Sequence, residues 1–159
     1  MRSVSVWQPW ASLLAQGAMR FDFKHFPLPA PYLGQELVLF AAPAPLREQE
    51  LVELAERLQA AEESPDPLMR VYRRNAALDL LTRHIVDCET VFPRGAGIGV
   101  IRYAGSVRAA ELFPDVAADL SPQLYAWSVE QAQAWPAPAY RRTHGYRGVF
   151  REWQEGCGE

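Results

Sequence analysis

Six segments of the chain have the patterns expected of strands, either an alternation of apolar and polar residues or a short, continuous apolar run. They span residues 3–7, 21–24, 35–42, 98–107, 124–130 and 145–153. The run QELVLFAA at residues 35–42 is typical of a strand buried on both faces, whereas SVSVW at residues 3–7 alternates. Because the segments do not alternate regularly with helices, they predict an α+β fold with a mixed or barrel-like sheet.

Three helices are predicted between these strands. Pro9 stands where a first helical residue is expected, the apolar residues that follow are spaced at three and four positions, and Gly17 ends the helix. Leu51, Leu54 and Leu58 form an apolar stripe on a second helix. Asp66 and Pro67 are the cap and first residue of a third, which reaches about His84.

The 159 residues are enough for one well-buried core. We expect a single domain over residues 1–154, with a helical insert at about 47–88 and a flexible tail at 155–159. Without a continuous apolar run of about 18 residues or a signal-like N-terminus, the pattern predicts a soluble, cytoplasmic protein that does not enter a membrane. Cys88 and Cys157, the two cysteines of the chain, argue against a disulfide framework.

The strand FDFK raises a specific question about its two faces. Successive side chains of a strand point to opposite sides, so Phe21 and Phe23 share one face and Asp22 and Lys24 share the other. We expect the phenylalanines to build core. The charged pair is then either a solvated surface pair or part of a binding cleft, and nothing local decides between the two.

Charge is unevenly distributed along the chain. The net charge is −3, and the segment 47–63 alone carries −4. Near the C-terminus, YRRTHGYRGVFR contains arginines and aromatic residues but no acid. Such a stripe can contact phosphate groups and stack on bases even in a mildly acidic protein, although four arginines also serve simply to keep a hairpin soluble.

Other candidate motifs do not complete a site. The glycines of RGAGIGV follow a turn and precede a strand, whereas the dinucleotide fingerprint needs a strand before and a helix after. His84 and Cys88 have a spacing that suits a metal on a helix, but two ligands without neighbours do not form a site. The sequence therefore predicts neither a metal nor a cofactor.

The opening SVWQPWASLLAQGAMRFDFKHF resembles the signature of ASCH domains (activating signal cointegrator homology), which belong to the PUA-like superfamily. The segment Gln8 to Ala11 and Gly17 match this signature. The family continues with lysine two, glutamate five and arginine seven residues after the glycine, where this chain has Met19, Asp22 and Lys24.

Later blocks extend the resemblance over nearly the whole chain except the insert at about 47–88. YLGQELVLFAA is similar to the family's glycine-led second strand, with Phe40 where a histidine is common. FPRGAGIGVIRYAGSV, YAWSVE and HGYRGVF are similar to its central, tryptophan-containing and closing strands.

The resemblance implies a PUA-like mixed β-barrel of about six strands, with a cleft beside the first helix and the charged strand. It also implies binding of RNA, another single-stranded nucleic acid, or a nucleoside or nucleotide. We expect Gln8, Trp10, Asp22 and Lys24 around this cleft. Three residues of the basic stripe are expected to contact phosphate: Arg141, Arg142 and Arg147.

Two other functions stay open. Some ASCH-related proteins are similar to acetylcytidine amidohydrolases or ribonucleases, with the motif lysine as base and a threonine as nucleophile. Here Met19 and Asp22 occupy those positions, so an enzyme would need Lys24 or Asp22 as its catalytic group. Alternatively, the insert docks a protein partner, but its leucine stripe is better explained by packing on the barrel, because a helix must bury its apolar face somewhere.

Overall fold

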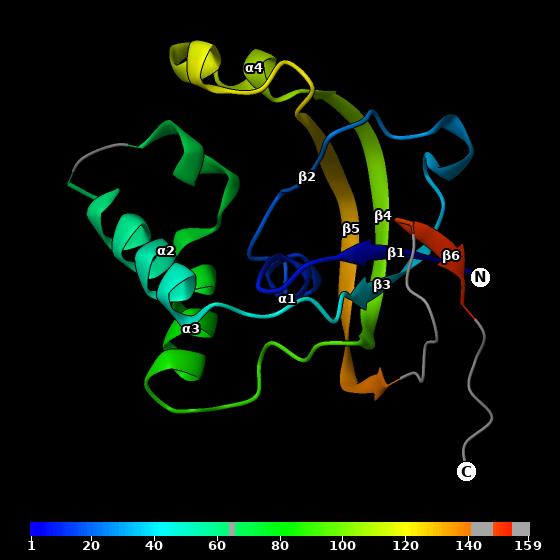
Figure 1. The fold of residues 1–159 in the computed structure, drawn as a ribbon, viewed down its shortest axis with the longest axis horizontal. Helices are drawn as coiled ribbons and strands as arrows, with labels where there is room; N and C mark the ends of the chain where they lie inside the picture. Colours follow the sequence, from blue (N-terminus) through cyan, green and yellow to red (C-terminus); the bar gives the residue numbers. More distant parts are fainter. Residues whose placement is uncertain (64–65, 141–147, 154–159) are drawn as a thin grey trace.

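The computed structural model describes residues 1–63, 66–140 and 148–153, and these residues form an α+β fold around one six-stranded mixed sheet (Figure 1). The strands are β1 (Arg2–Val6), β2 (Phe21–Lys24), β3 (Leu37–Ala41), β4 (Ala96–Arg108), β5 (Tyr125–Tyr140) and β6 (Phe150–Glu152). All six predicted strands are therefore present. The predicted α+β class is confirmed.

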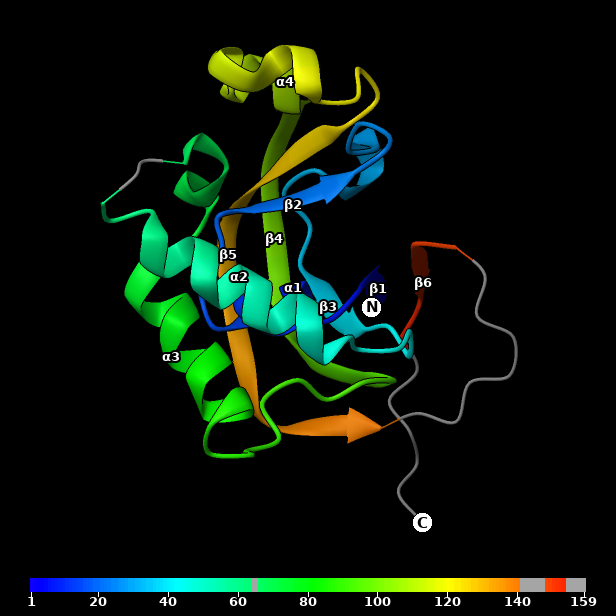
Figure 2. The same cartoon turned by 60° about the vertical axis from the view of Figure 1, so that its left-hand side comes forward.

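The sheet is open rather than a closed barrel. Its strand order is β2-β5-β4-β3-β1-β6, so β2 and β6 are the two edges. β1 pairs with β3 in parallel, and the other neighbours are antiparallel. The long strands β4 and β5 form the spine of the molecule (Figure 2).

Aromatic side chains bring the two ends of this open sheet together. The Trp127 ring of β5 stacks on the Phe150 ring of β6 with centroids 5.8 Å apart, and Phe150 stacks in turn on Tyr32 at 3.8 Å. Tyr32 belongs to a short 3-10 helix, η1 (Ala30–Tyr32). Side-chain packing thus joins β6, one edge of the sheet, to β5, which is the neighbour of the other edge strand.

The strand β5 is longer than the sequence pattern predicts. Residues 136–139, which contain two prolines and look like a connection, lie within it. β2 pairs only with the beginning of β5, at residues 125–128. Proline is tolerated where a strand does not have to donate a hydrogen bond to a second neighbour.

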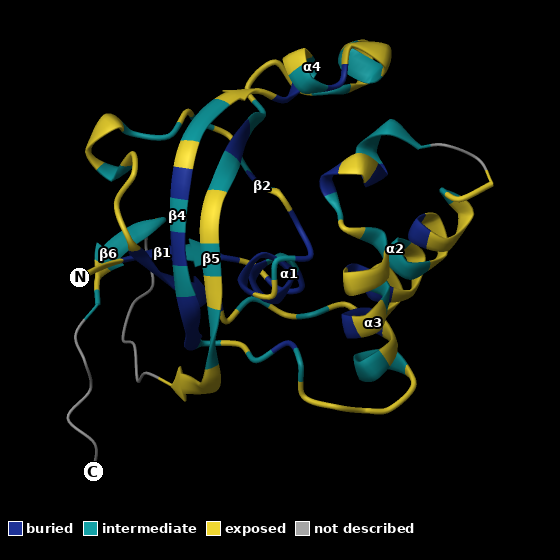
Figure 3. Ribbon diagram, turned by 180° about the vertical axis from the view of Figure 1, so that it is seen from behind, coloured by how far each residue is buried: buried dark blue, intermediate teal, exposed yellow. Residues whose placement is uncertain are grey.

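The remaining elements are helical. They are α1 (Trp10–Ala15), α2 (Glu48–Ala60), η2 (Pro67–Val71), α3 (Arg74–Ile85), α4 (Ala109–Leu112) and η3 (Pro114–Asp119). α1 lies between the sheet and the pair α2 and α3, and its residues 11–15 are all buried (Figures 1 and 3). No helix in the described ranges is long and apolar enough to cross a membrane.

The apolar stripe of α2 is buried within the fold. α2 packs against α3, and Leu51 and Leu58 are completely shielded from solvent as members of the core cluster. Leu54 packs partly buried against the same cluster. The stripe is consequently not open as a docking surface. The helix that carries it packs against α3.

The helix predicted from Asp66 to about His84 is divided in two. Asp66 caps the start as predicted, since its carboxylate accepts a hydrogen bond from the Leu68 amide at 3.0 Å. The 3-10 helix η2 ends at Val71, and the chain is extended at Tyr72 before α3 begins. The reason is a tertiary contact: Tyr72 forms an antiparallel bridge with Met19. The Arg20 amide donates to the Val71 carbonyl and the Arg73 amide to the Ala18 carbonyl, both at 2.8 Å.

Replacing Leu58 by alanine should lower the free energy of unfolding by about 3 kcal/mol, because it leaves a cavity between α2 and its neighbours. Val52 lies on the same helix but is 39% exposed, so Val52→Ala should change stability by less than about 1 kcal/mol. Urea denaturation of the two variants measures both values. Equal effects would contradict the burial of the stripe.

Candidate functional site

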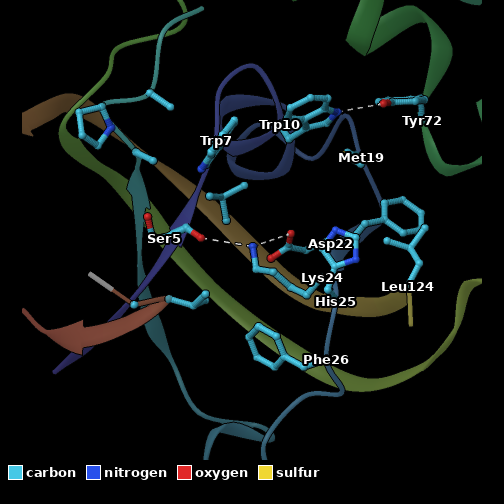
Figure 4. Close-up of a pocket in the computed structure, with 17 residues that line it drawn as sticks. Ser5, Trp7, Trp10, Met19, Asp22, Lys24, His25, Phe26, Tyr72 and Leu124 are labelled. Atoms are coloured by element: carbon cyan, nitrogen blue, oxygen red, sulfur yellow. Dashed lines mark hydrogen bonds and ion pairs between the residues drawn. The ribbon is translucent and has the colours of Figure 1, made fainter. Parts of the chain in front are cut away.

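A pocket of about 810 Å³ opens between the end of β1, the start of α1, β2 and Tyr72 (Figure 4). Its lining combines aromatic rings with one acid, one lysine and one histidine. The residues that line it include Ser5, Trp7, Trp10, Asp22, Lys24 and Tyr72. Three of the four residues expected around the cleft, Trp10, Asp22 and Lys24, therefore lie together at one pocket.

The charged face of β2 is not a solvated surface. Asp22 is only 3% exposed and lies with Lys24 at the pocket, while Phe21 and Phe23 pack half-buried against the core. β2 is an edge strand of a sheet whose ends approach each other, so its charged face points inward. The buried face is the polar one because two partners satisfy the carboxylate.

Both oxygens of the Asp22 carboxylate are hydrogen-bonded. The Tyr103 hydroxyl on β4 donates to Oδ2 at 2.6 Å, and the Lys24 ammonium donates to Oδ1 at 3.1 Å. Tyr103 is completely buried. A buried carboxylate without such donors would cost several kcal/mol, so these two bonds are what permits Asp22 to lie here.

Lys24 also joins β2 to β1. The Lys24 side chain is 13% exposed, and its ammonium donates a second hydrogen bond to the Ser5 carbonyl at 3.2 Å and lies 5.8 Å from the centroid of the Trp127 ring. The Ser5 amide donates to Val149 beside β6. Lys24 therefore closes the seam between the two ends of the open sheet at the base of the pocket.

Burial affects the acid–base properties of this cluster. Desolvation raises the pKa of Asp22 above its ordinary value of 3.8, although the charge of Lys24 and the hydrogen bonds from Tyr103 and Lys24 oppose the shift. Burial, reinforced by the Asp22 charge, raises the pKa of Tyr103 well above its ordinary range. The Tyr103 hydroxyl therefore remains a proton donor at neutral pH.

Gln8, the fourth residue expected at the cleft, does not line the pocket. Its side-chain amide donates to the Ser12 hydroxyl and to the Pro93 carbonyl, both at 2.7 Å, and its carbonyl accepts from the Ser12 amide at 3.0 Å. The Ser12 amide is one of the first donors of α1, which have no partner within the helix. Gln8 thus satisfies the start of α1 and fixes that helix to the loop at Pro93.

Two tryptophans at the start of α1 give the pocket its aromatic character. Trp7 is 63% exposed at the rim, so its ring is open to a ligand in the pocket. Trp10 is half-buried and donates its indole N–H to the Tyr72 hydroxyl at 3.3 Å. Trp127, by contrast, is completely buried and belongs to the core.

Tyr72 and Ser5 were not expected at the site from the sequence. Tyr72 belongs to the insert, which the family resemblance does not cover, and Ser5 contributes only a backbone carbonyl. Met19, where the resemblance places a lysine, also lines the pocket and is buried beside Tyr72. The wall formed by these two residues is therefore apolar except for the Tyr72 hydroxyl.

Arg141, Arg142 and Arg147, the residues expected to contact phosphate, lie outside the described residues. Gly148 and Val149, which follow them in the chain, line the same pocket as Lys24.

Comparison with solved structures finds similar folds. A crystal structure of a mutant of the ASCH protein ZmASCH from Zymomonas mobilis aligns with 96% of this chain and 87% of its own, at 12% sequence identity and a TM-score of 0.48. No family model and no curated protein matches the chain.

The raised pKa of Asp22 predicts how stability depends on pH. Because the folded state holds this proton more tightly than the unfolded chain, the stability that protonated Asp22 contributes is complete below about pH 3.8 and is lost as the pH rises through the folded pKa. Relative to the Asp22→Asn variant, the wild type should therefore lose stability from about pH 4 upward. Urea unfolding of both proteins over a pH series measures this difference. A wild type that gains stability relative to the variant would contradict the assignment.

Proposed function

We propose that this protein is a nucleic-acid-binding module that holds one base of a single-stranded RNA, or of a free nucleotide, in the pocket beside α1 and β2. The observation that carries the proposal is the combination of an exposed tryptophan at the rim with a buried acid–base pair at the base of the same pocket. A flat ring with polar edges is the ligand that these two features suit.

The dimensions and walls of the pocket support a ring-shaped ligand. A volume of about 810 Å³ lies within the range of roughly 300–1,000 Å³ that small-molecule sites occupy. Trp7, Trp10 and Tyr72 provide aromatic surfaces from two separate parts of the chain. Stacking of a base on such surfaces tolerates any sequence, because every base has a π-face.

The polar groups at the base of the pocket support recognition of a base edge. Lys24 and Asp22 are held by Ser5 and Tyr103, so their positions are fixed before a ligand arrives. A ligand that meets fixed partners loses less conformational entropy on binding than one that must order flexible side chains. Single-stranded nucleic acids present base edges that are free for such contacts.

The choice of a nucleic acid over other flat ligands is supported by the sequence. The opening segment around Trp10 and Gly17 resembles ASCH domains, and the arginines at 141, 142 and 147 form a basic stripe next to two pocket residues in the chain. Protein docking through Leu51 and Leu58 finds less support, since α2 would have to separate from the core to expose them.

Fluorescence anisotropy tests the proposal directly. The full chain is titrated into fluorescein-labelled octamers of uridylate, cytidylate and adenylate RNA, the matching DNA octamers and a duplex RNA, at two salt concentrations. The proposal expects saturable binding to single strands that weakens with salt. The absence of binding to every probe at protein concentrations up to about 100 μM would overturn it. Such a result means that the free energy of association is weaker than about −5 kcal/mol.

Replacing Trp7 by alanine should weaken binding of the preferred octamer by at least about fivefold, because one base–aromatic stack contributes roughly 1–3 kcal/mol. Trp7 is exposed, so the fold should be retained. Leu33→Ala is the control, since Leu33 is also exposed, at 51%, but does not line the pocket. If Trp7→Ala binds as tightly as Leu33→Ala, the rim does not stack on a base.

Changing Arg141, Arg142 and Arg147 together to glutamine should reduce the salt dependence of binding. Each phosphate contact on a single strand contributes about 0.7 to the slope of log K against log[salt], so the slope should fall by roughly 2. Anisotropy at four or more salt concentrations gives the slope. An unchanged slope would mean that these arginines make no phosphate contact.

A further inference from the structure

Tyr72 brings a side chain of the helical insert to the wall of the pocket. The antiparallel bridge with Met19 fixes the backbone of Tyr72 beside the start of β2. Residues paired in this way project their side chains to the same face, so Tyr72 and Met19 stand next to each other in the pocket wall (Figure 4). The insert is therefore part of the site rather than a separate appendage.

The hydrogen bond between Trp10 and Tyr72 has only one direction. An indole nitrogen can donate but cannot accept, so the Tyr72 oxygen must be the acceptor in this bond. The hydroxyl proton of Tyr72 is then free for a different partner. Across the described ranges of the chain, no residue accepts it.

Two further features favour a partner in the pocket. Met19, the neighbour of Tyr72 in the wall, offers only a weakly accepting thioether. Burial raises the pKa of the Tyr72 hydroxyl, against smaller opposing effects of the Trp10 bond and the Arg57 charge, so the proton is retained at neutral pH. A hydroxyl that already accepts one hydrogen bond is also polarised to donate a stronger one.

We propose that Tyr72 is a specificity-determining residue, which donates its hydroxyl proton to an acceptor on the edge of the bound base. The inference rests on the proposed function, since it names a contact within the same pocket. Trp10 acts through Tyr72 as a positioning residue by fixing the orientation of the hydroxyl. A base that places a carbonyl oxygen or ring nitrogen opposite Tyr72 binds well, and one that places an amino group there does not.

The test compares the wild type with Tyr72→Phe, which removes only the hydroxyl oxygen. Affinities for the fluorescein-labelled octamers of uridylate, cytidylate and adenylate are measured by anisotropy. The variant should bind the octamer preferred by the wild type about three- to tenfold more weakly, the range for one neutral hydrogen bond. Its affinity for the least preferred octamer should change less, so that the preference narrows.

Tyr32→Phe is the matched control, because Tyr32 stacks on Phe150 and does not line the pocket. It should leave all three affinities unchanged. If Tyr72→Phe lowers the affinity for all three octamers equally, the role of Tyr72 is merely structural and the inference is overturned. A wild type with equal affinity for the three octamers overturns it too. If the wild type binds none of them, the proposed function itself fails. Binding that is retained with unchanged preference in Tyr72→Phe refutes only the role of Tyr72.

Discussion

The buried carboxylate of Asp22 is the interaction on which the rest of this structure depends. A charged group in a protein interior is costly, and here two donors make it tolerable: Tyr103 on β4 and Lys24 on β2 itself. Because Lys24 also donates to Ser5 on β1, the same cluster ties one end of the open sheet to the other. The position of β2, the seam of the sheet and the base of the pocket therefore follow from one set of hydrogen bonds.

Elements from three parts of the chain complete the pocket around this cluster. Gln8 fixes the start of α1, which places Trp7 at the rim and Trp10 in the wall. The insert contributes Tyr72 through its bridge with Met19. Rigid, buried polar groups below and aromatic surfaces above are the arrangement that a ring with polar edges requires, and this is why binding is the function we propose.

Local patterns in the sequence predicted much of the fold because they depend on neighbouring residues. The alternation at residues 3–7 and the helix start at Pro9 belong to this class, and both elements are present. The contacts that define the site are long-range, since Tyr103 lies 81 residues from Asp22, and a periodic pattern contains no information about them. The same limit applies to β2: alternation groups Asp22 with Lys24 on one face, but it contains no information on the contacts with Tyr103 and Ser5 that bury this face.

The indole N–H resonances of the five tryptophans test most directly whether this pocket is the binding site. Trp7 and Trp10 line it, whereas Trp135 and Trp153 pack against each other, with centroids 5.9 Å apart, away from it. A ¹⁵N-labelled sample is titrated with the single-stranded octamer that binds best, with assignments from single tryptophan-to-phenylalanine variants. A ligand in this pocket should shift the Trp7 and Trp10 signals in a saturable way, while the Trp135 and Trp153 signals stay in place. Shifts confined to Trp135 and Trp153 would contradict it and place the ligand elsewhere on the sheet.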